Sequence, residues 1–194
     1  MDSLAIRRAA PADAPRLSAF AARTFVDTFG ADNTPEDMAL YLAETFTPER
    51  QRAEVADPGG VVLLAEMLGA GGVRELAGYA HLVAGPAPAA VAGPAPVELS
   101  RFYVAAPWHG RGVAAALMGA VLGAARARGA RTLWLGVWER NARAARFYEK
   151  CGFRRVGAHA FVLGRDVQTD WLMARGLDGS DGRGGPDRPA SGGA

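Results

Sequence analysis

The order of hydrophobic and polar residues changes from a strand-like to a helix-like period around residues 108–112. Residues 97–104 alternate between apolar and polar side chains and are rich in β-branched and aromatic types. This predicts a strand with Glu98 on the face opposite to its neighbours. From Val113 onward apolar residues recur at helical spacing, and Gly129 is placed to end that helix. The middle of the chain therefore predicts a strand, a glycine-rich turn and a helix.

The same patterns predict further elements on both sides of this unit. Strands are predicted at residues 4–8, 61–67, 75–83, 131–138, 160–163 and 170–174, and helices beginning near residues 15, 34, 48 and 141. Residues 84–96 contain two Pro-x-Pro groups and few side chains that can pack, so an exposed spacer is expected. We expect a single domain over residues 1–177 and a disordered tail over residues 178–194, where no apolar pattern is present.

The turn between the central strand and its helix has the properties of a phosphate site. The amides of residues 111–114 are expected at the positively charged start of the helix, where backbone N–H groups have no partner within the helix. Gly112 has no Cβ, so an anion can approach these amides closely. Glycine-rich turns also occur for packing reasons alone, and the turn by itself favours that plain interpretation.

A second candidate segment follows the next predicted strand. Asn141 and Tyr148 are seven residues apart, or two helical turns, so their side chains lie on one face of the predicted helix. Asn141 is suited to cap the helix, to hydrogen-bond a cofactor, or to do both. A tyrosine next to a phenylalanine on an amphipathic helix is most often a core residue. Spacing alone therefore leaves the role of Tyr148 open.

Together the two segments resemble the GNAT acyl-CoA N-acetyltransferases. His109, Gly112 and Ala114 match the fixed positions of the family signature Gln/Arg-x-x-Gly-x-Gly/Ala, with histidine where glutamine or arginine is usual. Residues 145–153 follow Asn141 and match the family segment Ala-x-x-Phe-Tyr-x-x-x-Gly-Phe. The resemblance implies an α/β (α+β) GNAT fold, with a mixed, mostly antiparallel twisted sheet and helices on both faces. It also implies acetyl-CoA as the cofactor.

The resemblance assigns residues to the cofactor and indicates one branch of the family. It implies that acetyl-CoA is bound by the central strand, the glycine turn and the later helix, through Phe102, Tyr103, Val104, His109, Gly110, Arg111, Gly112, Val113, Ala114, Asn141 and Tyr148. Residues 24–30, 35–38, 41–42, 134–139, 157–159 and 168–170 resemble the PaiA-like polyamine N-acetyltransferases. A small-molecule amine, and specifically a polyamine such as spermidine or spermine, is therefore the expected acceptor.

Acetyl transfer to an amine requires two proton movements. An alkyl ammonium has a pKa near 10.4, so a base must remove its proton before the amine can attack. Glu98, on the central strand shortly before the turn, is expected to be this base, and an ion pair with Arg101 is the structural alternative. By resemblance, Tyr148 is expected to protonate the leaving thiolate, and a backbone amide near residues 102–104 to stabilise the oxyanion.

Acidic and aromatic residues are candidates for the acceptor site. Asp27, Glu36 and Asp37 are expected to form an acidic rim for a cationic amine. The last two also suit the first turn of their helix, where the helix dipole favours acidic side chains. Trp138 and Glu139, at the carboxyl end of a predicted strand, are expected to border the acceptor pocket.

Composition and charge narrow the range of partners. The 22 Lys and Arg against 20 Asp and Glu residues give a formal net charge of +2 without a basic block, so nucleic acid is not an expected partner. A single cysteine excludes an intrachain disulfide, and the isolated His81 and His159 imply no metal site. No signal peptide or membrane-spanning run is recognisable, so a cytoplasmic protein is expected. The sequence is compatible with a homodimer.

Three functions remain open at the level of sequence. Acetylation of a polyamine is favoured by the branch resemblance, and acetylation of another amine, such as an amino acid, a drug or a protein N-terminus, is its nearest alternative. A CoA-binding regulator with little turnover is the alternative from another class, because PaiA-like proteins have been linked to transcriptional control. The presence of both Glu98 and Tyr148 favours an enzyme.

Overall fold

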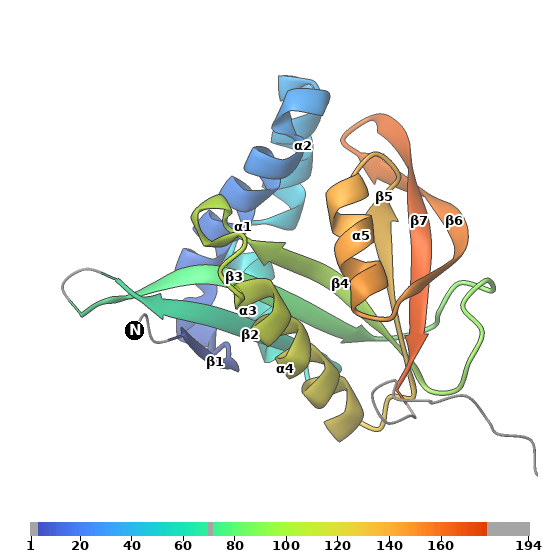
Figure 1. Ribbon diagram of the computed structural model, residues 1–194. Coiled ribbons are helices and arrows are strands. Elements are labelled where there is room, and N and C mark those ends of the chain that lie inside the picture. Colours follow the sequence, from blue (N-terminus) through green and yellow to red (C-terminus); the bar gives the residue numbers. More distant parts are fainter. Residues whose placement is uncertain (1–3, 70–71, 178–194) are drawn as a thin grey trace, which may run out of the picture.

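The chain folds around one twisted sheet. The computed structural model describes residues 4–69 and 72–177, in which seven strands follow the order β1-β2-β3-β4-β5-β7-β6 (Figure 1). The strands are β1 (Leu4–Arg8), β2 (Gly60–Leu68), β3 (Arg74–Ala84), β4 (Pro96–Val104), β5 (Thr132–Trp138), β6 (Arg154–Leu163) and β7 (Asp166–Gly176). In this part of the chain β4 and β5 run parallel and the other neighbouring strands run antiparallel. The predicted mixed, mostly antiparallel sheet is confirmed.

Helices cover both faces of the sheet, as predicted. They are α1 (Ala14–Phe29), α2 (Pro35–Thr45), α3 (Pro48–Ala56), α4 (Val113–Ala127) and α5 (Ala142–Lys150). The apolar sides of α4 and α5 share a core with Leu82 and Leu135 on one face, and α1, α2 and α3 pack with Leu64 and Tyr79 on the other. Among the described residues, no helix combines the length and apolar character needed to cross a membrane.

Side-chain caps explain where two of the helices begin. Thr34 Oγ1 accepts a hydrogen bond from the backbone N–H of Asp37 at 3.1 Å, at the start of α2. Asn141 Oδ1 accepts one from the backbone N–H of Ala144 at 3.1 Å, at the start of α5. Each cap satisfies an amide that has no partner within its helix. The predicted helix starts at these two positions are confirmed.

Two stretches differ from the sequence prediction. β6 and β7 are longer than the predicted residues 160–163 and 170–174, because most side chains of the edge strand β6 are exposed and leave little apolar pattern. In the connection before β4, Val91 is 7% exposed and packs in one cluster with Trp134, so the predicted exposure of this spacer is wrong at that position. The predicted tail, residues 178–194, lies outside the described residues.

β4 separates from its parallel neighbour after a short paired stretch. Pro96, Val97 and Glu98 of β4 are in register with residues 132–134 of β5. Beyond this point β4 continues to Val104 and β5 continues to its own end, and Figure 1 shows the two strands diverging. Backbone groups on the facing edges of the two strands therefore lack a strand partner there.

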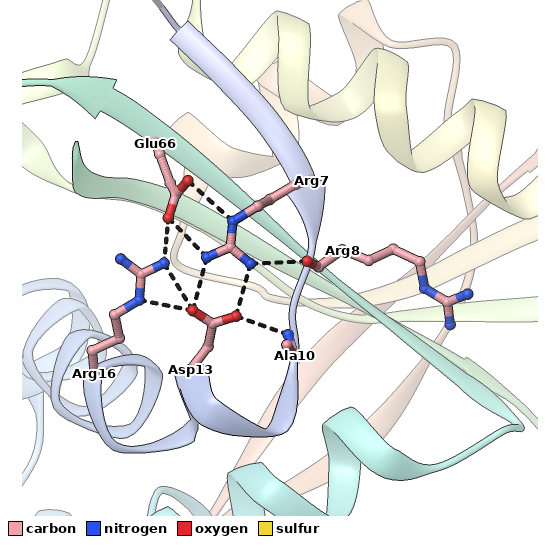
Figure 2. Close-up of polar contacts among 6 residues, drawn as sticks. All are labelled: Arg7, Arg8, Ala10, Asp13, Arg16 and Glu66. Atoms are coloured by element: carbon pink, nitrogen blue, oxygen red, sulfur yellow. Dashed lines mark hydrogen bonds and ion pairs between the residues drawn. The ribbon is translucent and has the colours of Figure 1, made fainter.

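An ionic network joins β1, the start of α1 and β2 (Figure 2). Arg7 donates hydrogen bonds to both carboxylate oxygens of Asp13, at 2.7 and 2.8 Å, and to both of Glu66, at 3.1 and 3.0 Å. Arg16 also donates to each of these carboxylates. Asp13 and Glu66 are only 8% and 4% exposed, so their charges depend on the two arginines for compensation.

Asp13→Asn is expected to lower the free energy of unfolding by about 2 kcal/mol at pH 7, because two guanidinium groups lose a charged partner. Arg7, with help from the Ala10 amide, holds the pKa of Asp13 well below its usual range. A carboxyl group with a lowered pKa stabilises the fold above the pKa of the unfolded state, near 4, and this contribution is lost as the pH falls.

Urea unfolding at pH 7 and pH 3 measures this difference. The gap between wild type and variant should shrink at pH 3, and the exposed Glu44→Gln should show no such gap at either pH. A gap of equal size at both pH values would contradict the ionic role of Asp13.

Candidate active site

A cavity of about 430 Å³ lies where β4 and β5 separate. On one side of the sheet its wall includes Ala114 of α4 and Phe147 of α5. On the other side the wall includes Phe25 of α1, Tyr41 of α2 and Phe161 of β6. Because the lining residues come from both faces, the cavity passes through the sheet and connects its two sides.

The turn before α4 presents unpaired amides next to this cavity. Gly110 and Gly112 have positive φ angles of 74° and 81°, which L-residues with a side chain adopt at a cost. Gly112 is the N-cap of α4 and no side chain caps this helix start, so its first amides remain available. A helix start with available amides and no acidic residue in its first turn suits a phosphate group.

His109 fastens this turn to its surroundings. Its Nε2 lies 2.7 Å from the carbonyl oxygen of Val104, and its Nδ1 lies 2.9 Å from a guanidinium nitrogen of Arg143 on α5. A carbonyl only accepts and a guanidinium only donates, so Nε2 carries the proton and Nδ1 accepts. The histidine that departs from the family signature therefore links the end of β4, the turn and α5. Its side chain holds the turn in place and brings the positive charge of Arg143 beside it.

The structure brings most of the residues predicted to hold the cofactor to the cavity. The residues that line it are Phe102, Tyr103, Val104, His109, Gly110, Ala114, Asn141 and Tyr148. Arg111, Gly112 and Val113 do not line it: Val113 is 1% exposed in the core, and the Arg111 guanidinium lies 5.4 Å from the Trp108 ring centre. The backbone N–H of Arg111 donates to the Trp108 carbonyl at 3.4 Å, so it is partly engaged, unlike those that follow it.

A bulge in β4 determines which side chains face each side of the cavity. The register between β3 and β4 skips Ser100. Strict alternation would place Glu98 and Phe102 on one face of the sheet. Because of the extra residue, Phe102 packs with the α4 and α5 core, whereas Tyr103 packs with the core under α1. Glu98 lies on the α1 side, opposite to Phe102.

Two backbone amides of β4 point into the opening. The N–H of Ala105 donates to the carbonyl of Ala77 on β3 at 2.9 Å. Successive residues of a strand direct their N–H groups to alternate sides, so the amides of Val104 and Phe102 point away from β3, toward the side where β5 has separated. Their position in the cavity wall suits them to stabilise negative charge that develops on a carbonyl oxygen.

Glu98 is a half-buried carboxylate in the cavity wall. Burial raises its pKa, and the positive charge of Arg101 counteracts this only in part. The predicted alternative, an ion pair with Arg101, is not formed, because the Arg101 guanidinium donates to Glu54 of α3 at 2.5 and 3.1 Å. In the described part of the chain no side chain hydrogen-bonds to Glu98, which leaves its carboxylate able to accept a proton from a ligand.

Tyr148 is on α5, on the other side of the sheet from Glu98, and also lines the cavity. It is 8% exposed, and the rings of Phe102, Phe147 and Phe153 pack around it with centroid distances of 6.2, 5.6 and 5.7 Å. Burial raises the pKa of Tyr148 well above its usual value, so the hydroxyl is protonated at neutral pH. Tyr148 therefore occupies the core position that its sequence context favours, and it also reaches the cavity.

Aromatic side chains dominate the wall on the α1 and α2 side. Phe25 stacks with Tyr41 at a centroid distance of 4.7 Å, and Tyr41 contacts Phe161 edge-on at 5.6 Å. Phe29 contacts Trp138 edge-on at 5.8 Å. All five line the cavity, so the structure places Trp138 in this aromatic wall. Ring faces attract cations, so this wall suits an alkylammonium group.

The predicted acidic rim is not assembled at the cavity. Asp27 and Glu36 are exposed and do not line it, and Glu139 is exposed just beyond the lining. Asp37 accepts hydrogen bonds from Thr34 Oγ1 at 2.7 Å and from the backbone N–H of Arg165 at 2.7 Å. Asp37 therefore fastens α2 to the turn between β6 and β7. Its contact with the N-cap Thr34 agrees with a structural role at the start of α2.

The carboxylate that does line this side of the cavity, besides Glu98, is Asp170 of β7. His159 of β6 and Gly136 of β5 lie beside it in the wall. Local patterns do not single out Asp170 or His159 as acceptor-site residues, because the pairing of β5, β7 and β6 that brings them together joins distant parts of the sequence. Within residues 4–69 and 72–177, no group of three or more His, Cys, Asp or Glu is arranged to hold a metal ion.

Comparisons with known proteins agree with this architecture. The sequence matches the family model described as "Acetyltransferase (GNAT) family" over residues 24–153. It is 36% identical over 177 residues to an uncharacterized N-acetyltransferase of Lactobacillus delbrueckii subsp. lactis, covering 91% of this chain and 99% of that protein.

Solved structures share the fold at lower identity. The PaiA N-acetyltransferase of Thermoplasma acidophilum, solved in complex with coenzyme A, gives a TM-score of 0.69 at 18% identity and covers 90% of this chain and 99% of its own. The yncA protein of Salmonella typhimurium, solved with its cofactor acetyl-CoA, gives 0.66 at 20% identity, with 95% and 98% covered. With the family model matched over most of the sequence and the relative aligned along nearly its whole length, the chain belongs to the acetyltransferase (GNAT) family.

Proposed function

We propose that this GNAT enzyme transfers the acetyl group of acetyl-CoA directly to a primary amine that carries further positive charge, a polyamine such as spermidine or spermine. The observation that carries the proposal is the cavity through the sheet. It joins a glycine turn whose free amides suit a phosphate group, on one side, to an aromatic wall with two carboxylates, Glu98 and Asp170, on the other. Negative charge and ring faces both favour a cationic acceptor.

The side chains in the cavity supply the two proton transfers that the reaction needs. Bound acetyl-CoA provides the thioester carbonyl that is attacked. Glu98 accepts the proton that the ammonium must lose before its nitrogen forms the new C–N bond. Tyr148, protonated at neutral pH, donates its proton to the sulfur as the C–S bond breaks. The amides of Phe102 and Val104 stabilise the negative charge on the carbonyl oxygen.

The cavity is less suited to an acceptor that carries a carboxylate. Among the described residues that line the acceptor side of the cavity, Arg101 is the one with a permanent positive charge, and Glu54 already neutralises it with two hydrogen bonds. An amino acid acceptor would place its carboxylate near Glu98 and Asp170 without a free counter-charge on that side. The structure therefore favours the polyamine over the amino acid alternative.

Turnover of acetyl-CoA, followed by release of the free thiol, tests the proposed function. The acceptors should include spermidine, spermine, simple diamines, amino acids, an aminoglycoside and a short peptide. We expect the highest kcat/KM with the polyamines and diamines. Equal or better turnover with an amino acid or a peptide would contradict the proposed acceptor, and silence with every amine would contradict the proposed activity.

Gly112→Val is expected to weaken CoA binding by about tenfold. A β-branched residue at a φ of +81° costs at least 1–2 kcal/mol, so the turn is expected to relax and move its amides away from the phosphate position. Calorimetry with CoA measures the affinity. Gly123→Ala, at an open position further along α4, is the control and should leave the affinity unchanged. An unchanged affinity in Gly112→Val would mean that the phosphate site lies elsewhere.

A further inference from the structure

Three polar side chains from neighbouring strands form a row on the acceptor side of the cavity. The register pairs Trp138 of β5 with Asp170 of β7, and Asp170 with His159 of β6. Residues paired across adjacent strands project to the same face of a sheet. All three line the cavity, so the row forms part of the wall that an acceptor would contact.

Gly136 makes the space into which two of these side chains extend. A Cβ at Gly136 would lie 3.1 Å from Asp170 Oδ2 and 3.1 Å from His159 Nε2. The carboxylate and the imidazole therefore converge over Gly136, which itself lines the cavity. No hydrogen bond or ion pair joins the two groups, although both are within the described part of the chain. A ligand group that reaches this position can contact both.

The row contains buried polar atoms without a partner in the described structure. Asp170 Oδ1 and the indole Nε1 of Trp138 are both buried and make no hydrogen bond. Trp138 is 8% exposed, so its indole N–H is held in the cavity wall away from bulk solvent. An unpaired buried acceptor is unfavourable, and a ligand that donates a hydrogen bond to it removes this penalty. Burial, reinforced by the negative charge of Glu139, raises the pKa of Asp170 to about 6.

Among residues 4–69 and 72–177, no positively charged side chain forms an ion pair with Asp170. The groups that interact with it electrostatically are Glu139, which is acidic, and Tyr41 across the cavity, which is neutral at physiological pH. A positively charged ligand would therefore stabilise the ionised carboxylate. The ring of Tyr41 also lines the cavity and is near enough for the charge of Asp170 to affect its pKa, and aromatic rings attract cations.

The two cavity carboxylates lie at different levels along β5. Glu98 is in register with Trp134, and Asp170 is in register with Trp138, four residues further on. Four residues of a strand correspond to about 13 Å, and the Asp170 carboxylate reaches back toward Gly136 to shorten this separation. The spacing leaves room for an alkyl chain between two charged ends.

We propose that Asp170 binds the second, non-reacting ammonium group of a diamine or polyamine acceptor, with His159 and Trp138 beside it and Gly136 providing the space. Glu98 serves the reacting amine at the other end of the same molecule. The inference rests on the proposed function and adds to it the residue that selects acceptors with two positive charges. Asp170 is a specificity residue in this account, because it contacts the acceptor away from the reacting atoms.

The test compares Asp170→Asn with wild type on two acceptors of equal chain length, 1,4-diaminobutane and butylamine. Loss of a hydrogen bond to a charged group is worth about 1.5–3 kcal/mol, which corresponds to about 10–150-fold. We expect kcat/KM for the diamine to fall by about 30-fold, mainly through KM, and that for butylamine to change less than about threefold. Asp32→Asn, an exposed carboxylate outside the cavity, is the control and should change neither.

Gly136→Ala tests the same site with its charge intact. The new Cβ would meet the Asp170 and His159 side chains at 3.1 Å, so it should displace them and raise KM for the diamine more than for butylamine. A similar loss for both acceptors in both variants would overturn the proposal. A wild-type kcat/KM for the diamine in Asp170→Asn or in Gly136→Ala would also overturn it.

Calorimetric titration of 1,4-diaminobutane into the protein with CoA separates this inference from the proposed function. Diamine binding that is lost in Asp170→Asn supports the site even where turnover is slow. Binding of equal strength in both proteins overturns the role of Asp170 while acetylation of amines still stands. If wild type neither binds nor acetylates the diamine, both proposals are overturned.

Discussion

Tyr148→Phe is expected to lower kcat by about 100-fold or more, with less than a threefold change in the affinity for CoA. The substitution removes only the hydroxyl group, and loss of a positioned proton donor typically costs 10²–10⁴ in rate. The surrounding rings of Phe102, Phe147 and Phe153 pack against the ring of Tyr148, so phenylalanine should occupy the same place. The effect should therefore fall on the chemical step and leave cofactor binding nearly unchanged.

Steady-state kinetics and CoA calorimetry on the same preparation measure this split. Tyr79→Phe is the matched control, because the Tyr79 hydroxyl is buried, has no partner in the described structure and does not line the cavity. The control should keep its turnover. Wild-type turnover in Tyr148→Phe would remove this residue from the role of acid, and a parallel loss of CoA affinity would make it a binding residue.

Glu98→Gln is expected to lower kcat by about 100-fold at neutral pH and to remove the acidic limb of the kcat profile. A base must be ionised to act, and burial raises the pKa of Glu98 above its ordinary value near 4.3. In wild type the rate should therefore fall as the pH drops through this raised pKa, and it should be lost at a higher pH than an exposed glutamate would allow. Glutamine does not titrate, so the variant should lack that limb.

A pH series of kcat with spermidine at saturation checks this prediction. Glu149→Gln, an exposed position on α5, controls for the removal of a carboxylate and should keep both rate and profile. An acidic limb that survives unchanged in Glu98→Gln would assign the proton transfer to another base or to water.

Local patterns predicted the elements that carry the cofactor side of the site. The strand at residues 97–104, the turn at Gly112 and the helix caps at Thr34 and Asn141 depend on neighbouring residues alone, and each is present in the structure. Such features follow from backbone preferences and from alternation of apolar side chains, which act over a few residues. The sequence is therefore informative about this half of the cavity.

The acceptor side depends on pairing between distant strands. The bulge at Ser100 changes which side chains share the face of Glu98, and no residue type near it marks the change. The row of Trp138, Asp170 and His159 exists only because β7 lies between β5 and β6. Charge makes Asp37 an acceptor candidate, but its hydrogen bond from the backbone of Arg165 exists only because α2 packs against the β6–β7 turn.

The most direct test of the central claim is the initial-velocity pattern with acetyl-CoA and spermidine varied together, with acetylated spermidine identified by mass spectrometry. Direct transfer within one cavity requires both molecules to be bound at once. The double-reciprocal lines should therefore intersect, with one thiol released for each acetylated product. Parallel lines, the pattern of a covalent acetyl-enzyme, or thiol release without acetylated spermidine would contradict the account.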